Sequence, residues 1–351
     1  MKKTTLNGLI FLAFLIFFSS CKNRNSGTSA DLKPSFPNAE SDYYCPDIVS
    51  GHFHNPDTKR DVKWPEHPSG RILMKTNNLG FRKDSPTLVK KSPGTTRILI
   101  TGDSHTDGVI NNSESVTARL EEMLELKHPE NNYELLNAGT GYFGPQNYLG
   151  VYQKFLNLQP DYFIVIVYTG NDFLDGIRIE AENNRLMVPE RKDDYYQDLW
   201  KVDKQYPGFT GQYLNQVKFF KSFPQFTETA TLIMKENLEE INVLCKKNKT
   251  RLLVVLLPSK IDSEFSTDSA RITEVFRTMK FTEKDIPENL KFTDSLKDWM
   301  ANENLPYVDL LEPFQQSDQE LFWKADYHVN HLGHEEMAKQ MIMAGFFTNN
   351  Q

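Results

Sequence analysis

The sequence predicts an α/β fold in which helices cover both faces of a parallel sheet of about five strands. Short apolar runs alternate along the chain with longer segments whose apolar residues recur at helical spacing. One run, Asp161–Tyr168, is apolar on both of its sides, as expected for a strand buried between two layers of helices. Strands that alternate with helices form a parallel sheet, so the predicted architecture is a three-layer α/β/α sandwich.

The predicted elements follow one another in a regular order. Strands are predicted at 97–101, 133–137, 161–168, 251–257 and 307–310. Helices are predicted at 115–126, 145–158, 229–247 and 333–344 from the spacing of their apolar residues. Pro160 and Gly170 bound the third strand, and Pro258 ends the fourth. Because parallel sheets bind ligands at the carboxyl ends of their strands, the polar residues that follow the strands form the candidate site.

An aromatic-rich insert at about 176–228 interrupts this alternation, between the third strand and the helix at 229–247. A connection of this length usually has structure of its own or a function. Two interpretations are open. The aromatic side chains form a packed minicore, or the insert forms a lid over bound substrate.

The composition indicates a folded protein without a nucleic-acid partner. The chain has 351 residues, of which 39% are hydrophobic and 25% charged. Its formal net charge is −7, and it has no basic face that would neutralise phosphates. Cys45 and Cys245 could pair in an oxidising compartment, but two distant cysteines do not establish a disulfide. A buried free thiol at Cys245 is the other possibility.

The N-terminal segment has the pattern of a secretory signal followed by a tether. Lys2 and Lys3 precede an apolar run at 9–18, which is too short for a comfortable membrane span, and Ser19-Ser20-Cys21 follows. This pattern resembles a bacterial lipoprotein signal. The resemblance implies a signal peptide at 1–21, a lipid on Cys21, and a protein anchored to a membrane of the bacterial cell envelope. The alternative is a plain signal peptide with an incidental cysteine.

The rest of the chain divides into three parts by composition. Residues 22–40 are polar and are expected to form a flexible tether. Residues 41–96 are expected to form a loop-rich extension that packs on the core. Residues 97–348 are expected to form the main domain.

Four motifs lie at the predicted strand ends or just before the last helix. They are Gly102-Asp103-Ser104, the stretch 137–146, Gly170-Asn171-Asp172 and Asp326-Tyr327-His328. The first three each have a structural explanation when taken alone: a capping serine, a glycine turn, and a turn asparagine. Together and in this order, the four motifs resemble the SGNH/GDSL hydrolase family, in the bacterial secreted or lipoprotein branch that carries an Asp-x-His motif. The resemblance covers roughly residues 70–345 and implies the flavodoxin-like sandwich of SGNH hydrolases.

The resemblance implies a catalytic role for each motif. Ser104 would be the nucleophile, His328 the general base, and Asp326 the residue that orients the base. The N–H groups of Ser104 and Gly141, together with the side chain of Asn171, would bind the oxyanion.

Two of these assignments have alternatives. Gly139 could replace Gly141, because this segment is one residue shorter than the family arrangement. His331 could replace His328 as the base, because Asp326 lies further upstream of His331. His105, next to the nucleophile, is expected to face solvent on its helical turn.

Two remaining features concern packing and metals. Thr76–Arg82 resembles an N-x-x-G-F-R segment of secreted family members, and a packing role is expected for it. A ligand cluster could be formed by Asp326, His328, His331 and His334, with His52 and His54 in addition. His328 and His334 are poorly placed to share one helix face with His331, so no metal site is expected. The resemblance implies no cofactor.

The expected function is a serine esterase that removes a small acyl group, most plausibly from a carbohydrate, through an acyl-enzyme at Ser104. Its partners would be the ester substrate, such as an acylated glycan, and the membrane that holds the lipid anchor. The alternatives are an O-acyltransferase that uses the same site and a non-catalytic glycan-binding protein of the envelope.

Overall fold

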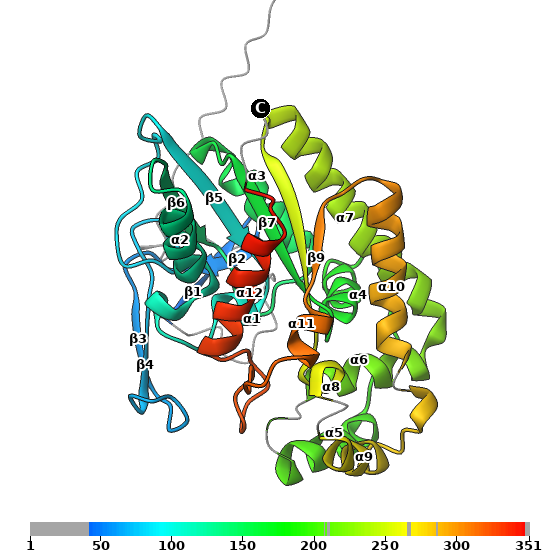
Figure 1. The fold of residues 1–351 in the computed structure, drawn as a ribbon. Helices are drawn as coiled ribbons and strands as arrows, with labels where there is room; N and C mark the ends of the chain where they lie inside the picture. The colour runs from blue at the N-terminus through cyan, green and yellow to red at the C-terminus, as the bar shows by residue number, and fades with distance from the viewer. Residues whose placement is uncertain (1–41, 207, 209–210, 265–267, 286, 348–351) are drawn as a thin grey trace, which may run out of the picture.

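A five-stranded parallel sheet forms the centre of the protein in the computed structural model, which describes residues 42–206, 208, 211–264, 268–285 and 287–347. The strands are β5 (Thr95–Thr101), β6 (Asn132–Asn137), β7 (Tyr162–Tyr168), β8 (Arg251–Leu257) and β9 (Tyr307–Asp309). They lie in the order β6-β5-β7-β8-β9, and all neighbours are parallel (Figure 1). The predicted fold class and all five predicted strands are confirmed. From β5 the chain runs to β6 on one side of it and then crosses to β7 on the other side. The order of the strands therefore reverses at β5, and ligands of parallel sheets usually bind at the carboxyl ends of the strands beside such a switch point, here β5 and β7.

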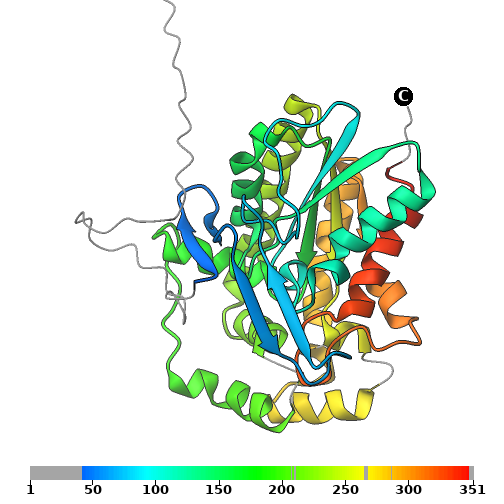
Figure 2. The same cartoon turned by 90° about the vertical axis from the view of Figure 1, so that its left-hand side faces the viewer.

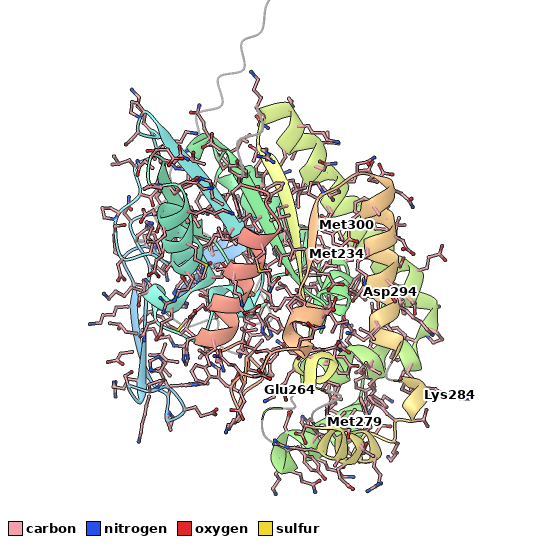
Figure 3. All side chains as sticks on the ribbon, in the orientation of Figure 1. Met234, Glu264, Met279, Lys284, Asp294 and Met300 are labelled. Atoms are coloured by element: carbon pink, nitrogen blue, oxygen red, sulfur yellow. The ribbon has the colours of Figure 1, made fainter. Side chains whose placement is uncertain are left out.

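Helices cover both faces of this sheet (Figure 2). On one face lie α2 (Val116–Lys127) and α12 (His331–Met343), and on the other lie α3 (Pro145–Lys154), α4 (Asp172–Glu182), α7 (Thr227–Asn248) and α10 (Pro287–Asn302). Met234 and Met300 are both buried in the second of these layers (Figure 3). Phe163 of β7 enters the core under the second layer, whereas its neighbour Ile164 enters the core under the first. This alternation explains why β7 is apolar along its whole length.

The aromatic insert is mostly helical. It contains the end of α4, then α5 (Asp193–Gln205), α6 (Gly211–Ser222) and η3 (Pro224–Phe226). Its side chains pack with α8 (Lys260–Glu264) and α9 (Ser269–Thr278), which the sequence analysis did not predict, in a cluster that includes Tyr213 and Met279. Phe219, Phe220 and Phe226 join the main core instead. The minicore interpretation is therefore confirmed for part of the insert, and the lid stays a prediction.

Residues 42–96 are loop-rich, as expected, and within them lie two antiparallel hairpins that the sequence did not indicate. They are formed by β1 (Tyr44–Asp47) with β2 (Gly51–His54) and by β3 (Lys59–Lys63) with β4 (Arg71–Lys75) (Figure 2). Four of the five residues of β3 are exposed and most are charged, so the strand has no apolar alternation by which it could be recognised. Phe53 and Phe81 anchor this region, because both are buried in the main core.

The remaining short elements are η1 (Asn112–Glu114), η2 (Leu156–Leu158), η4 (Glu283–Asp285) and α11 (Leu311–Gln315). Cys245 is a free thiol buried in α7, so it does not pair with Cys45. The predicted signal segment, Cys21 and the tether at 22–40 lie outside the described residues. Among the helices that the structure does describe, none has the length and apolarity needed to cross a bilayer.

Candidate active site

The turn that carries Ser104, the expected nucleophile, follows directly from the end of β5. After Gly102, the carboxylate of Asp103 accepts a hydrogen bond from the His105 backbone N–H at 2.9 Å and so caps α1 (Ser104–Asp107). A Cβ atom on Gly102 would lie 2.8 Å from the Ile166 carbonyl oxygen, so the close approach to β7 requires glycine. Because Asp103 is the cap, the capping explanation of Ser104 is wrong, and its hydroxyl is left for other partners.

Ser104, His328 and Asp326 form one hydrogen-bonded chain. Ser104 Oγ lies 2.9 Å from His328 Nε2, and His328 Nδ1 lies 2.5 Å from Asp326 Oδ1. A carboxylate can only accept, so Nδ1 carries the proton and Nε2 can accept the serine proton. Burial raises the pKa of Asp326, but the charge and hydrogen bonds of His328 outweigh this effect and hold that pKa below its ordinary value. Asp326 is therefore ionised at neutral pH, as an orienting carboxylate must be.

Several contacts hold the loop that carries Asp326 and His328. Asn330 caps α12 by accepting the Leu332 and Gly333 N–H groups, and its Nδ2 donates to the Phe322 carbonyl oxygen at 3.1 Å. The Lys260 ammonium donates to the Trp323 carbonyl oxygen at 2.8 Å. These bonds fix the loop from its two ends, which places the imidazole opposite the nucleophile.

The alternative base, His331, is not brought to Ser104. It is the first residue of α12, where its ring centroid lies 6.0 Å from that of His67 and 5.8 Å from that of Trp323. His334 is fully buried, its Nδ1 accepts the Val116 N–H at 3.1 Å, and burial lowers its pKa to about 3. Over the described part of the chain, no group of three His, Cys, Asp or Glu side chains could hold a metal ion.

Both backbone N–H groups that are expected to bind the oxyanion lie without an acceptor among the described residues. Ser104 is the first residue of α1, and neither its N–H nor that of Gly141 has an acceptor among the described residues. A Cβ atom built on Gly141 would lie 3.9 Å from the Ser104 Cβ, so the two residues are neighbours. The N–H of Gly139, by contrast, donates to Asn137 Oδ1 at 2.9 Å. This geometry favours Gly141 over Gly139.

Asn171 comes from the end of β7, the strand next to β5. Its side chain is largely buried, and its Nδ2 donates to Asp175 Oδ2 of α4. An amide nitrogen carries two N–H groups, so one remains for another acceptor. Ser104, Gly141 and Asn171 thus all lie at the switch point between β5 and β7.

His105 is not exposed, contrary to the expectation from the sequence. Its side chain is fully buried, stacks on Tyr168 at 3.7 Å between ring centroids, and lies 4.8 Å from the His328 ring. Burial lowers the pKa of His105 far below its ordinary value, so the ring is neutral. The one-turn helix packs against β7, and this close packing buries a position that an isolated helical turn would expose.

Sequence reasoning missed how Arg82 acts on the nucleophile helix. Arg82 is fully buried and donates to Asp107 Oδ1 at 2.8 Å and to the carbonyl oxygens of Asp107, Gly108 and Ile110 at 2.6, 3.0 and 2.8 Å. Arg82 therefore neutralises Asp107, the last residue of α1, and satisfies the carbonyl groups at and just beyond the end of that helix. The packing role expected for the Thr76–Arg82 segment is confirmed. The segment packs, through Arg82, against the end of α1, the short helix that begins with Ser104.

The first hairpin also contacts the site. His52 of β2 lies with its Nε2 2.7 Å from the Gly141 carbonyl oxygen, and because burial lowers the pKa of His52 to about 4, its ring is neutral and donates from Nε2. His54 Nε2 lies 3.2 Å from Asp107 Oδ2, and the Tyr44 hydroxyl donates to the same oxygen at 3.0 Å. No motif in the sequence indicated these contacts, because each joins residues more than 50 positions apart.

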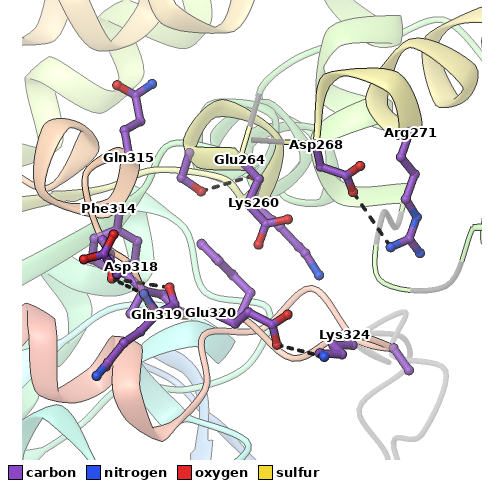
Figure 4. A pocket seen from close by; sticks show the side chains of 15 residues that line it. Lys260, Glu264, Asp268, Arg271, Phe314, Gln315, Asp318, Gln319, Glu320 and Lys324 are labelled. Carbon is purple, nitrogen blue, oxygen red and sulfur yellow. Dashed lines mark hydrogen bonds and ion pairs between the residues drawn. The ribbon is translucent and has the colours of Figure 1, made fainter. Parts of the chain in front are cut away.

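A groove of about 640 Å³ lies beside the loop that leads to Asp326 (Figure 4). Residues of α8, α9, α11 and the stretch 317–325 line it, and Glu320 pairs with Lys324 at 3.1 Å. Its charges are of both signs, and Ser104 is not among its lining residues. The groove is therefore separate from the serine site.

Comparisons with known proteins give likeness of structure only. No protein-family model matches the chain, and no curated protein matches it in sequence. Among solved structures, it is similar to an acetylxylan esterase from Geobacillus stearothermophilus, with 14% identity and a TM-score of 0.42 over 72% of this chain and 95% of the other. It is similar to an alpha/beta hydrolase from the metagenome of Lake Arreo, with 16% identity and a TM-score of 0.41 over 71% and 94%. It is also similar to a putative lipolytic protein of the G-D-S-L family from Desulfitobacterium hafniense, with 17% identity and a TM-score of 0.39 over 71% and 99%. The function of this chain has to be inferred from its own side chains.

Proposed function

We propose that the chain is a serine esterase of the SGNH/GDSL type. The observation that carries this proposal is the hydrogen-bonded chain from Ser104 Oγ through the His328 imidazole to the Asp326 carboxylate. Serine is a weak nucleophile without a base, and this arrangement supplies the base, its orientation and the required tautomer.

The acylation step follows from this geometry. Ser104 Oγ attacks the ester carbonyl carbon while its proton moves to His328 Nε2, and Asp326 stabilises the imidazolium. The carbonyl electron pair moves to the oxygen, which the N–H groups of Ser104 and Gly141 and the Asn171 amide are placed to receive. One such donor contributes about 3–4 kcal/mol to the transition state.

Three further proton transfers complete the cycle. When the tetrahedral intermediate collapses, the imidazolium gives its proton to the departing alkoxide, and the acyl group remains on Ser104. His328 then takes a proton from water, the hydroxide attacks the acyl carbon, and Ser104 is released with its proton.

We propose that the substrate is a small acyl ester of a carbohydrate. Tyr142 follows Gly141 directly and is 52% exposed, so an aromatic ring is available beside the oxyanion donors. The ring of Tyr327 lies 4.3 Å from that of His328. Aromatic rings at this position suit the alcohol part of a sugar ester, and the family resemblance adds the expectation of a short acyl group.

Hydrolysis of p-nitrophenyl acetate tests the serine site. The soluble body, residues 22–351, is compared with Ser104→Ala, His328→Ala and His331→Ala. The first two substitutions are expected to lower kcat by about 10⁴-fold or more, because the nucleophile or its base is lost. His331→Ala is the matched control and is expected to leave the rate within a few-fold. Equal rates for Ser104→Ala and the unsubstituted protein would contradict the proposal.

A chain-length series tests the substrate. Acetyl to octanoyl esters are compared on one alcohol, and acetylated methyl glycosides are compared with ethyl acetate. We expect kcat/KM to fall as the acyl chain lengthens and to be higher for the acetylated glycoside. A preference for octanoyl esters would contradict the small acyl group.

We also propose that Cys21 carries the lipid that anchors the protein in the bacterial envelope. The support is the sequence of the first 21 residues alone. Labelling with a radioactive fatty acid is expected for the natural chain and not for Cys21→Ser, which should appear in the soluble fraction.

A further inference from the structure

Asp175 and Arg178 of α4 connect the two oxyanion donors that lie outside the nucleophile turn. Asp175 Oδ2 accepts from the Asn171 amide, and Asp175 Oδ1 accepts from Arg178 Nε at 2.8 Å. Arg178 Nη2 then donates to the carbonyl oxygen of Tyr142, the residue after Gly141, at 2.8 Å. One ion pair on a single helix face therefore reaches both Asn171 and the Gly141 loop.

The Asp175 carboxylate decides which way the Asn171 amide points. An amide offers an oxygen acceptor on one side and an N–H₂ donor on the other, and rotation by 180° exchanges them. A carboxylate accepts only, so it selects the orientation in which Nδ2 faces it. Asn171 Oδ1 is buried and has no hydrogen-bond partner among the described residues, so no other contact selects that orientation. In the rotated amide, oxygen would replace nitrogen, and an acceptor cannot stabilise an oxyanion.

Arg178 also holds the loop that His52 of the first hairpin contacts. Tyr142 has a φ of +65°, a left-handed conformation that costs free energy for a residue other than glycine and needs contacts to hold it. His52 holds the Gly141 carbonyl oxygen at 2.7 Å, and Arg178 holds the next carbonyl oxygen along the chain. Two successive carbonyl groups on the C-terminal side of Gly141 are thus held, and these bonds anchor the loop that carries the Gly141 N–H.

We propose that Asp175 and Arg178 are positioning residues of the oxyanion hole, Asp175 acting through the Asn171 amide and Arg178 through Asp175 and the Tyr142 carbonyl. This inference rests on the proposed esterase function. The side chains of Asp175 and Arg178 are 14% and 26% exposed, so solvent competes little for the bonds that Asp175 accepts, whereas the bond from Arg178 to the Tyr142 carbonyl oxygen is exposed. Neither residue touches the attacking hydroxyl or its base in the contacts described above.

A double-mutant cycle on p-nitrophenyl acetate hydrolysis tests the link to Asn171. Asp175→Asn is expected to lower kcat about 10- to 1000-fold, the loss typical of one oxyanion donor, with KM changed less than threefold. The same substitution in an Asn171→Ala background is expected to change kcat less than threefold, because the donor that it orients is gone. Arg178→Lys keeps the charge but loses the forked geometry of the guanidinium group. Its kcat is therefore expected to lie between that of Arg178→Gln and that of the unsubstituted protein.

The control is Arg185→Gln. Arg185 also pairs with a carboxylate of α4, Glu180, but it is 56% exposed and has no contact with Asn171 or the Gly141 loop. Its substitution is expected to leave kcat within twofold. Equal losses from Asp175→Asn in both backgrounds would overturn the proposal, because they would show that Asp175 acts elsewhere.

A second measurement does not depend on activity. The Asn171 side-chain amide protons, assigned by their disappearance in Asn171→Ala, are followed by NMR. The proton that is bonded to the carboxylate is expected far downfield in the unsubstituted protein and in Ser104→Ala, and shifted upfield in Asp175→Asn. An unchanged amide signal in Asp175→Asn would overturn the positioning role. If the unsubstituted protein hydrolysed no ester but still showed the downfield Asn171 amide signal, the result would count against the esterase function and not against the positioning role.

Discussion

Replacing Arg82 with methionine should remove much of the protein's stability, because Arg82 is the buried cation beneath the nucleophile helix. Its side chain is 0% exposed, and that of its partner Asp107 is 5% exposed. It donates to three carbonyl oxygens, to Asp107 Oδ1, and from Nε to Asn112 Oδ1 at 3.0 Å. Methionine fills part of the volume but removes the donor of the three carbonyl oxygens and the cation that pairs with the buried Asp107 carboxylate.

The magnitude follows from the cost of breaking a buried ion pair. Removal of one partner usually costs about 3–5 kcal/mol, because the other charge stays buried. His54 and Tyr44 still face Asp107, so we expect Arg82→Met to lower the free energy of unfolding by about 3–5 kcal/mol rather than more. Urea unfolding at pH 7, followed by circular dichroism, measures this loss. The free energy of unfolding of Arg82→Lys should lie between those of the natural protein and Arg82→Met.

The matched control is Arg71→Met. Arg71 pairs with Asp61 at 2.9 Å on the surface, where the side chains are 58% and 49% exposed. Because solvent screens such a pair, we expect a change of at most about 1 kcal/mol. A loss below about 1 kcal/mol for Arg82→Met as well would refute the reasoning that burial makes this arginine important.

The pH dependence of the same variant has a definite sign. Burial raises the pKa of Asp107, but His54 and Arg82 outweigh this effect and hold that pKa well below its ordinary value. A depressed carboxyl pKa adds stability above the unfolded-state pKa of about 3.9, and this stability is lost as the pH falls through the folded-state value. The difference in stability between the natural protein and Arg82→Met should therefore be largest near neutral pH and shrink in acid. A difference that grew in acid would contradict this account.

Three further outcomes are expected. Gly139→Ala should unfold at a lower urea concentration than the natural protein, because its Cβ would lie 2.6 Å from the Asp107 backbone nitrogen. Gly141→Ala, whose Cβ would lie 3.0 Å from the Tyr44 hydroxyl, should mainly lower kcat. Equal unfolding midpoints for the two variants would contradict this expectation. Burial raises the pKa of the Cys245 thiol to about 12, so Ellman's reagent should react with Cys245 only in the unfolded protein, and fast labelling in buffer would show the thiol exposed. Asp326→Asn should lower kcat by about 10⁴-fold at pH 7 with little change in KM, because the amide can select the wrong imidazole tautomer, and a loss below tenfold would remove Asp326 from the site.

The sheet could be predicted from the sequence because burial on two sides leaves a pattern that does not depend on distant residues. Asp161–Tyr168 and Arg251–Leu257 are apolar after their first residue, and both form strands within one residue of the prediction. The hairpins at 44–75 could not be predicted in this way. Most residues of β3 are charged and exposed, so the strand has no apolar alternation. The contacts that hold the first hairpin on the core, such as His52 with Gly141 and His54 with Asp107, join positions far apart in the chain.

The sequence by itself determined the types of chemical group at the strand ends: a hydroxyl, two glycines, an amide and a histidine near an aspartate. The tertiary structure decided which of them meet. Ser104 and His328 are 224 positions apart in the chain, yet Ser104 Oγ and His328 Nε2 lie 2.9 Å apart. This contact identifies His328, rather than His331, as the histidine that faces Ser104. The N–H of Gly139 is bonded to Asn137 while that of Gly141 has no acceptor among the described residues, and His105 is buried rather than exposed. Hydrogen bonds depend on distances of a few tenths of an ångström and on direction, and only the packing of the whole sheet and its helices sets these.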